Sequence, residues 1–331
     1  MAKKYLSEAL LITCTDNQYN IIDWLYWHLY VVKFDHVVLI DNSPDKNLEK
    51  IANYPEFKDL VSYYSYPGRI SQVDTYTEYV NNSEAWWVLP IDDDEFLYLN
   101  PKNYSTINDL IKDVFVKHNS FYRIGFTWAM MMSDKLLDKI DYKEFSYIET
   151  YRHWLNNIPV KYNILAFGSM YDIKTMVNTC MKHLYHIENS HCVTEDDLKF
   201  RNTLRVNRVG PVYEHIGNVH NPITYYNGKY QISYNISKNS VTFGFRSYFP
   251  ITIAAPALLL HFKFRSLQDW QYKCNSRKHF TDTNQIFFDK QYLENRIADY
   301  YTSYGNYSQQ FDMPFNIYNN YKSEIIKIKS R

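Results

Sequence analysis

The chain has 331 residues, and its 36 lysines and arginines equal its 36 aspartates and glutamates, so the formal net charge at pH 7 is zero. A chain of this length can bury a large core, and the lack of a basic excess argues against nucleic acid as a partner. The four cysteines form no CxxC pair, and every apolar run is too short to span a bilayer. We therefore expect a cytoplasmic protein with reduced thiols and at most peripheral contact with a membrane.

Strand and helix patterns alternate in the first third of the chain, which predicts an α/β fold with a mixed, mostly parallel sheet flanked by helices. Apolar runs predict strands at residues 9–14, 36–40, 60–64 and 86–91. Apolar residues at helical spacing predict helices at residues 21–32, 48–54 and 73–80. Asp16 or Asn17 is placed to cap the first of these helices.

Polar residues follow each predicted strand of this region. Ligands of open α/β sheets bind outside the carboxyl ends of the strands, so these side chains should converge on one crevice. The residues concerned are Thr15, Asp16, Asp41, Asn42, Asp92, Asp93 and Asp94. This convergence predicts a nucleotide site.

An apolar, aromatic stretch leads directly into four acids, Asp92, Asp93, Asp94 and Glu95, after which apolar residues resume. Carboxylates this close repel each other and lose hydration if buried, so they need a cation or solvent among them. Oxygen ligands favour a hard divalent ion, Mg²⁺ or Mn²⁺. In an extended segment Asp93 would point away from its two neighbours. The simpler interpretation is an acidic turn after a strand, but the apolar residues on both sides favour a site.

The later elements are less regular. Patterns predict an amphipathic helix that carries His118 as a core residue, strands, and a helix capped by Ser266. The predicted strands are at residues 121–130, 160–177 and 251–260, and a last helix is at 292–304. Residues 199–248 are irregular, and no repeat or linker divides the chain.

We expect one main domain, residues 1–285, followed by a helical extension at residues 286–331. Within the main domain, residues 1–100 form the nucleotide-binding half. Residues 101–285 form the acceptor half and carry insertions.

Several motifs occur in a fixed order along roughly residues 8–278. They are Asp23-Trp24-Leu25 with His28, residues 36–43, Gln72, residues 91–96, residues 174–177, and residues 260–267. This series resembles glycosyltransferase family 92 and its family-2-like relatives, which have the GT-A fold and an Asp-x-Asp-Glu-Phe signature. The resemblance implies transfer of a monosaccharide from a nucleotide sugar, expected to be UDP-linked, to a hydroxyl of a glycan or another acceptor.

The resemblance also implies metal and donor sites. A diphosphate leaving group gains negative charge as the glycosidic bond breaks, and Mn²⁺ or Mg²⁺ held by Asp92 and Asp94 would neutralise it. His261, at the end of a buried strand, is the third candidate ligand, and a histidine bonded to backbone is the alternative. The residues expected at the donor are Thr15, Asp16, Asp41, Asn42, Gln72, Asp92, Asp93, Lys174 and Lys263.

Acceptor and base candidates follow from the same resemblance and from the chemistry. Glu95, Trp128 and His191 are expected near the acceptor, although Glu95 could equally be structural. An inverting transfer needs a general base, for which Asp196 and Asp197 are candidates beside the metal-binding Asp94. The run that contains Asp196 and Asp197 also fits an ordinary helix start.

Other functions fit the sequence less well. A nucleotidyltransferase acting on sugar phosphates would show a glycine-rich loop after the first strand, and residues 11–20 contain no glycine. A non-catalytic carbohydrate-binding protein of the same fold is the third interpretation, against which the paired aspartates argue. Cysteines and histidines crowd into residues 180–192 without the spaced pairs that are typical of zinc sites.

Overall fold

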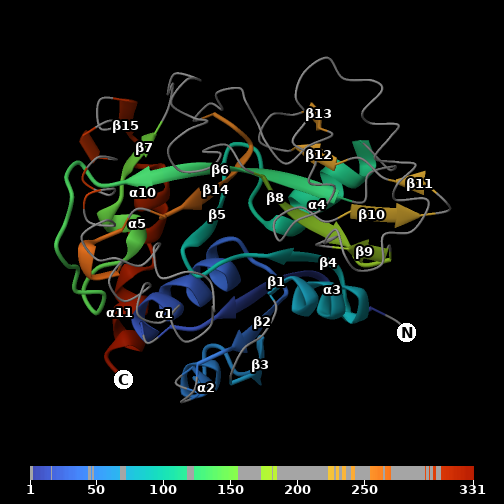
Figure 1. Ribbon diagram of the computed structural model, residues 1–331, viewed down its shortest axis with the longest axis horizontal. Coiled ribbons are helices and arrows are strands. Elements are labelled where there is room, and N and C mark those ends of the chain that lie inside the picture. The colour runs from blue at the N-terminus through green and yellow to red at the C-terminus, as the bar shows by residue number, and fades with distance from the viewer. Residues whose placement is uncertain are drawn as a thin grey trace.

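The protein is a mixed α/β structure whose central sheet is mostly parallel and flanked by helices (Figure 1). The computed structural model describes residues 3–15, 17–43, 46, 48–67, 72–117, 123–155, 173–180, 182–184, 223–226, 229–230, 233–235, 240–242, 254–263, 265–269, 295, 298, 301–302 and 307–331.

Four parallel strands in the order β3-β2-β1-β4 form the centre of the sheet. Their bounds are Tyr5–Thr13 for β1, His36–Asp41 for β2, Val61–Ser65 for β3 and Ala85–Pro90 for β4. Every residue of β2 is buried, as is typical of a parallel strand that is covered on both faces. All four strands agree with the sequence prediction to within a few residues.

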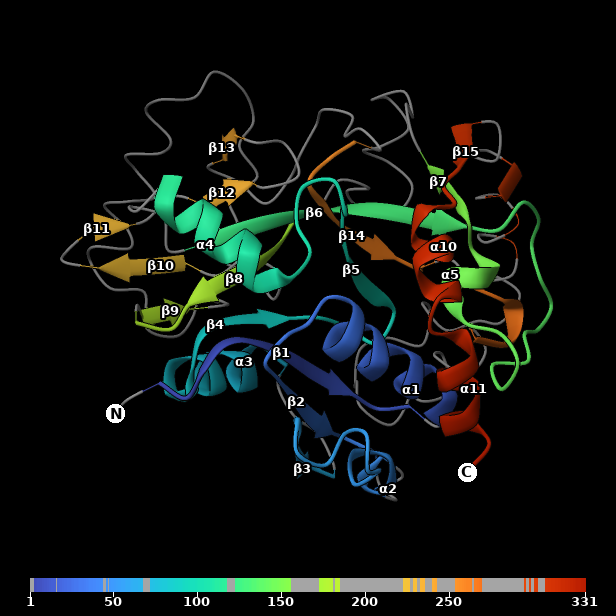
Figure 2. The same cartoon turned by 180° about the vertical axis from the view of Figure 1, so that it is seen from behind.

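Helices cover both faces of these strands (Figures 1 and 2). Their bounds are Gln18–Tyr26 for α1, Glu49–Ala52 for α2, Gln72–Asn82 for α3 and Ile107–Lys117 for α4. Leu11 and Leu39 face the larger core with α1 and α4, whereas Leu10 and Val38 face α3. This alternation follows from the two-residue period of a strand.

The predicted first helix is made of two pieces. Asn17 caps α1 by accepting a hydrogen bond from the Asn20 amide, as one of the two predicted caps. A single π-helical turn, η1 (Trp27–Val31), continues it, with the Val32 amide bonded to the Trp27 carbonyl. Lys33 ends the turn with a φ of 65°, a left-handed conformation common after helices.

Strand β6 (Arg123–Met132) organises the second part of the sheet, and all ten of its residues are buried. It pairs with β8 (Ile173–Asn178), which joins it to β4, and with β14 (Ala257–His261). β14 also pairs with β5 (Glu95–Leu99), which places His261 opposite Glu95. The remaining elements are α5 (Tyr147–Thr150), β7 (His153–Leu155), β9 (Lys182–Leu184), β10 (Ile223–Tyr226), β11 (Lys229–Tyr230), β12 (Ser233–Asn235), β13 (Ser240–Thr242) and β15 (Ser308–Gln310).

The carboxyl-terminal helices α10 (Met313–Asn319) and α11 (Lys322–Lys329) lie beside α1 (Figure 1). Tyr318, Ile325 and Ile328 are buried in the same core as α1. The end of the chain is therefore built into the core that supports the first helix.

Some predictions need correction. Residues 199–248, expected to be irregular, contain the short strands β10 to β13. A strand was predicted at residues 251–260. In the described part of the chain, the strand runs from Ala257 to His261, and residues 254–256 before it form a turn instead. His118 lies outside the described residues. None of the described helices is long and apolar enough to cross a membrane.

Candidate active site

The acidic motif lies where the strand order reverses. The chain passes from β1 through β2 to β3 on one side and then crosses to β4 on the other side of β1. Ligands of open α/β sheets bind at such a switch point, outside the carboxyl ends of the strands. Asp92, Asp93 and Asp94 come directly after β4, and Thr13 at the end of β1 donates a hydrogen bond from Oγ1 to Asp93 Oδ2 (2.7 Å).

The four acids form a tight turn between β4 and β5. The Glu95 amide donates to the Asp92 carbonyl (3.1 Å), and the Asp92 amide donates to Glu95 Oε2 (2.9 Å). The Asp92 side chain is 28% exposed, whereas that of Asp94 is 4% exposed. Of the two aspartates, Asp92 is therefore the more accessible to solvent.

Lys174 of β8 supplies a fully buried ammonium beneath the turn. Its Nζ lies 2.9 Å from Asp92 Oδ2 and 2.5 Å from Glu95 Oε2. Burial alone would lower the pKa of Lys174, but the carboxyl groups of Asp92 and Glu95 outweigh it and raise that pKa. Lys174 is thus a fixed cation inside the protein, and it holds Asp92 in place.

Glu95 is fully buried, and its pKa is raised to about 8, because the effect of burial, to which Asp92 and Asp94 add, outweighs the opposing effect of Lys174. Its Oε1 has no hydrogen-bond partner among the described residues. This carboxyl therefore keeps its proton to a higher pH than an exposed glutamate does. These contacts fit the structural alternative for Glu95 rather than contact with an acceptor.

Asp94 is enclosed by two basic side chains. His261 Nε2 lies 3.6 Å from Asp94 Oδ1, and Arg265 Nη2 lies 3.4 Å from Asp94 Oδ2. The Phe262 amide donates to the Asp94 carbonyl (2.8 Å), which ties the turn to the segment after β14. Arg265 is oriented by donating from Nη1 to the Tyr147 hydroxyl (2.7 Å).

Trp128 of β6 packs against His261, with ring centroids 4.2 Å apart at 60°. It is 5% exposed, so the indole contributes mainly to holding the imidazole beside Asp94. Lys263 follows two residues after His261 and is partly exposed. Two predicted residues, Trp128 and His261, are thereby brought together with the acidic turn.

The donor set fits a divalent cation in its chemistry. Asp94 and His261 are neighbours and offer carboxylate oxygen and imidazole nitrogen, and Asp92 lies in the same turn. In the described part of the chain, no three His, Cys, Asp or Glu side chains are gathered as a complete metal site. Mg²⁺ is usually held by one or two carboxylates together with substrate phosphates and water, so a partial protein shell is compatible with such an ion.

Asp41, which was predicted to bind the donor, makes its described contacts within the protein. It is fully buried, and its carboxylate accepts hydrogen bonds from the Ser43 amide (2.9 Å), the Leu48 amide (3.3 Å) and the Tyr63 hydroxyl (3.0 Å). The bond to an amide two residues on is the usual aspartate turn. Asp41 therefore shapes the loop after β2. Its neighbour Asn42 donates to a backbone carbonyl (2.5 Å).

Other predicted residues are only partly described. Thr15 accepts a hydrogen bond at Oγ1 from the Asn17 amide (3.0 Å) at the end of β1. Gln72 is the first residue of α3. The predictions for Asp16, His191, Asp196 and Asp197 lie outside the described residues.

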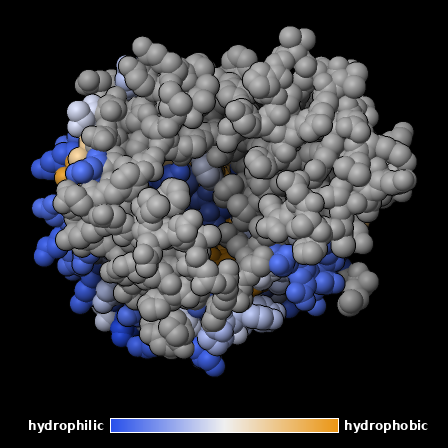
Figure 3. Space-filling view, in the orientation of Figure 1, coloured by the Kyte–Doolittle hydropathy of each residue, from blue (hydrophilic) through white to orange (hydrophobic). Residues whose placement is uncertain are grey.

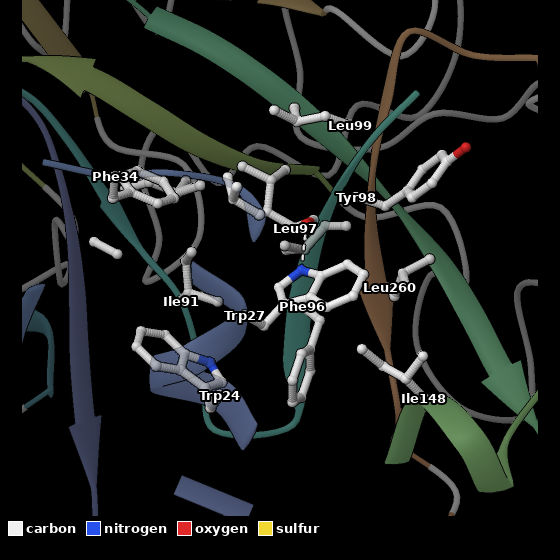
Figure 4. Close-up of a cluster of buried hydrophobic side chains, with 14 of the residues drawn as sticks. Trp24, Trp27, Phe34, Ile91, Phe96, Leu97, Tyr98, Leu99, Ile148 and Leu260 are labelled. Atoms are coloured by element: carbon white, nitrogen blue, oxygen red, sulfur yellow. Dashed lines mark hydrogen bonds between the residues drawn. The ribbon is translucent and has the colours of Figure 1, made fainter. Parts of the chain in front are cut away.

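The first helix was predicted from the sequence, but its contacts with the acidic turn were not. Asn20 Nδ2 donates to the Asp93 carbonyl (2.8 Å), and Trp24 Nε1 donates to the Asp92 carbonyl (3.0 Å). One turn further on, Trp27 Nε1 donates to the Leu97 carbonyl (2.7 Å), as drawn in Figure 4. The available signal was a set of amide, indole and imidazole side chains at helical spacing on an otherwise apolar face.

His28 completes this set. Its Nδ1 lies 2.9 Å from the Trp24 carbonyl, and its Nε2 lies 3.2 Å from the Leu97 amide. Burial lowers the pKa of His28 to about 3, so the ring is neutral and donates from Nδ1 while accepting at Nε2. The amide and the carbonyl of Leu97 in β5 are thus both bonded to side chains of η1.

The space-filling view shows hydrophilic described residues at the floor of a hollow near the middle of one face (Figure 3). Together, the fold and the site define an α/β protein with a carboxylate-rich site at the switch point of its sheet.

No family model matches the chain, and no curated protein matches it. Among solved structures it is similar to S. aureus TarS, at 10% identity and a TM-score of 0.28 over 53% of this chain and 28% of that one. Residues 1–349 of TarS in complex with UDP-GlcNAc give 17% identity and a TM-score of 0.27 over 41% and 36%. The same piece in complex with UDP gives 12% identity and a TM-score of 0.28 over 53% of this chain and 47% of that one. The chain spans less than half the length of these structures, and similarity at this level assigns no family.

Proposed function

We propose that the protein is a metal-dependent glycosyltransferase of the GT-A type, which transfers a monosaccharide from a UDP-linked donor to a hydroxyl of a glycan or another acceptor. The observation that carries the proposal is the acidic turn at the β1/β4 switch point, where Asp92 and Asp94 lie with His261 and two buried cations. Open α/β sheets bind nucleotides at this place.

The chemistry asks for charge stabilisation at the leaving group. When bound, Mn²⁺ or Mg²⁺ would neutralise the charge that develops on the diphosphate. Asp94 and His261 would hold it, joined by Asp92, whose side chain is already partly open. Lys174 holds the Asp92 carboxylate in place, and Arg265 does the same for the Asp94 carboxylate.

The remaining assignments are parts of the same proposal. Thr15 and Asn42 lie at the carboxyl ends of β1 and β2, on the side where a nucleobase would extend from the switch point. Lys263 would reach the diphosphate, and Trp128 would border the acceptor. The general base, proposed as Asp196 or Asp197, would take the proton from the acceptor hydroxyl.

A thermal-shift and donor-hydrolysis screen tests the proposal. UDP-sugars should raise the melting temperature only when Mn²⁺ or Mg²⁺ is present, and donor hydrolysis should require the metal. Asp94→Asn should abolish both effects while the protein stays folded. Asp59→Asn, which changes an exposed aspartate, is the matched control and should behave as the wild type. A metal-independent shift, or full turnover in Asp94→Asn, would overturn the assignment.

A further inference from the structure

Helix α1 supports the acidic turn through its backbone. Asn20 and Trp24 donate from their side chains to the carbonyls of Asp93 and Asp92, at 2.8 Å and 3.0 Å. Both contacts involve backbone atoms of the residues proposed to bind the metal and the donor. The position of α1 therefore sets the position of the two acids.

Asp23, next to Trp24 on α1, is bonded to the end of the chain. Its Oδ1 accepts from the Tyr318 hydroxyl of α10 (2.8 Å), and its Oδ2 accepts from Lys329 Nζ of α11 (2.7 Å). The side chains of Asp23 and Lys329 are 0% and 1% exposed. Residues 306 positions apart in the sequence thus form one buried ion pair beneath the helix that supports the turn.

Lys329 also reaches the second support of the site. Its Nζ donates to the Tyr142 carbonyl (2.8 Å), and the Tyr142 ring packs edge-on against Tyr147, with centroids 5.0 Å apart. Tyr147 accepts the hydrogen bond from Arg265, which pairs with Asp94. A single ammonium therefore joins the contacts that lead through α1 to Asp92 and through Tyr147 and Arg265 to Asp94.

Stability alone does not account for this arrangement. Removing a carboxylate and an ammonium from water costs about as much as their attraction returns, and an apolar pair of similar size often serves folding as well. Burial raises the pKa of Asp23 to about 6, against the opposing effect of Lys329. What the charged pair adds over an apolar one is direction, because its hydrogen bonds fix α1 relative to α11 and to the segment that contains Tyr142.

We propose that Lys329 is a positioning residue of the acidic site, which it holds in register by bonding Asp23 on α1 and the Tyr142 carbonyl at once. The expected effect of Lys329 on ligand affinity rests on the proposed function. The coupling of the last helix to the turn at residues 92–95 does not depend on any ligand.

Hydrogen exchange measures the coupling directly. Lys329→Met should speed exchange of a peptide covering residues 88–99 by about tenfold, because the turn loses its fixed support. Lys327→Met changes an exposed lysine on the same helix and should leave that peptide unchanged. Circular dichroism identifies a temperature at which each variant is folded. If Lys329→Met does not fold, the double variant Asp23→Asn with Lys329→Met, which removes both charges together, is used in its place.

Affinity for UDP with Mn²⁺ is the second readout. Lys329→Met should weaken it about tenfold, and Lys329→Arg, which keeps the charge and the donors, should restore most of it. Equal exchange at residues 88–99 in Lys329→Met and Lys327→Met would overturn the positioning role. A wild-type protein that fails to bind UDP with Mn²⁺ would instead overturn the proposed function, while the exchange result still decides the role of Lys329.

Discussion

Two buried polar clusters lie in the same central sheet, one near the amino ends of β1, β2 and β3 and one after the carboxyl end of β4. In the amino-end cluster, Glu8 accepts hydrogen bonds from Tyr79 (2.9 Å) and Ser83 (3.0 Å) at one oxygen and pairs with His36 (2.7 Å) at the other. His36 Nε2 lies 3.1 Å from Ser62 Oγ. Each oxygen of the carboxylate is engaged inside the protein, and Glu8 is 1% exposed.

The carboxyl-end cluster is built differently. It places four acids in one turn, beside the buried cations Lys174 and Arg265, and leaves the Asp92 side chain 28% exposed. Like charges this close destabilise the folded protein, and folding alone gains nothing from them. The amino-end cluster thus has its carboxylate fully engaged inside the fold, whereas the carboxyl-end cluster keeps a partly exposed carboxylate, as the proposed metal site requires.

The largest expected effect is in the carboxyl-end cluster. Lys174→Met should lower the free energy of unfolding by about 3 kcal/mol, because Asp92 and the buried Glu95 both lose the ammonium that bonds them. Urea denaturation measures the change. Adding Asp92→Asn should recover part of the loss, since the carboxylate that needed the cation is gone. Lys50→Met, at an exposed lysine of α2, is the control, and an equal effect in both lysine variants would show that the buried cation is unimportant.

The amino-end cluster should respond in stability alone. Glu8→Gln weakens the bond to His36 and should lower the free energy of unfolding by about 2 kcal/mol. Affinity for UDP with Mn²⁺, measured by calorimetry on the folded variant, should stay at the wild-type value. A loss of affinity comparable to that of Asp94→Asn would mean that the two clusters are not separate in function.

A pH series distinguishes the clusters further. The pKa of Glu95 is raised to about 8 in the folded protein, so the folded state holds a proton that the unfolded state has released. Its contribution to stability is therefore complete below its unfolded pKa and is lost as pH rises through about 8. Between pH 6 and 8 the wild type should lose about 1 kcal/mol per pH unit relative to Glu95→Gln, which mimics the protonated form. Parallel stability curves for the two proteins would contradict a neutral Glu95.

The smallest effect is expected at the rim of the amino-end cluster. Ser62→Ala removes one hydrogen bond to His36 and should cost about 1 kcal/mol or less. Donor hydrolysis should be unchanged, although the order serine, histidine, glutamate is that of a hydrolytic triad. A fall in donor hydrolysis without a fall in the folded fraction would indicate that the amino-end cluster takes part in catalysis.

The parts of the structure that sequence analysis predicted are those that depend on local pattern. The apolar run of β2 and the acids after β4 could be predicted because each is a pattern of neighbouring residues in the sequence. The contacts of Asp41 were not predicted: its carboxylate accepts a hydrogen bond from the amide of Ser43, which places the side chain in the turn.

The missed contacts depend on tertiary register. Arg265 meets Asp94, and Lys329 meets Asp23, only once β14, α1 and α11 have packed. No periodicity in the sequence indicates which of many lysines and arginines will be buried. These pairings are therefore properties of the assembled core.

Calorimetric titration of the wild-type protein with UDP, with and without Mn²⁺, tests the central claim most directly when it is repeated on Asp94→Asn. We predict that UDP binds the wild type at least about tenfold more tightly with Mn²⁺ than without it, a difference of about 1.4 kcal/mol or more, and that Asp94→Asn removes the difference. Equal affinity of the wild type for UDP in the presence and absence of Mn²⁺ would contradict a metal-bridged diphosphate at the acidic turn.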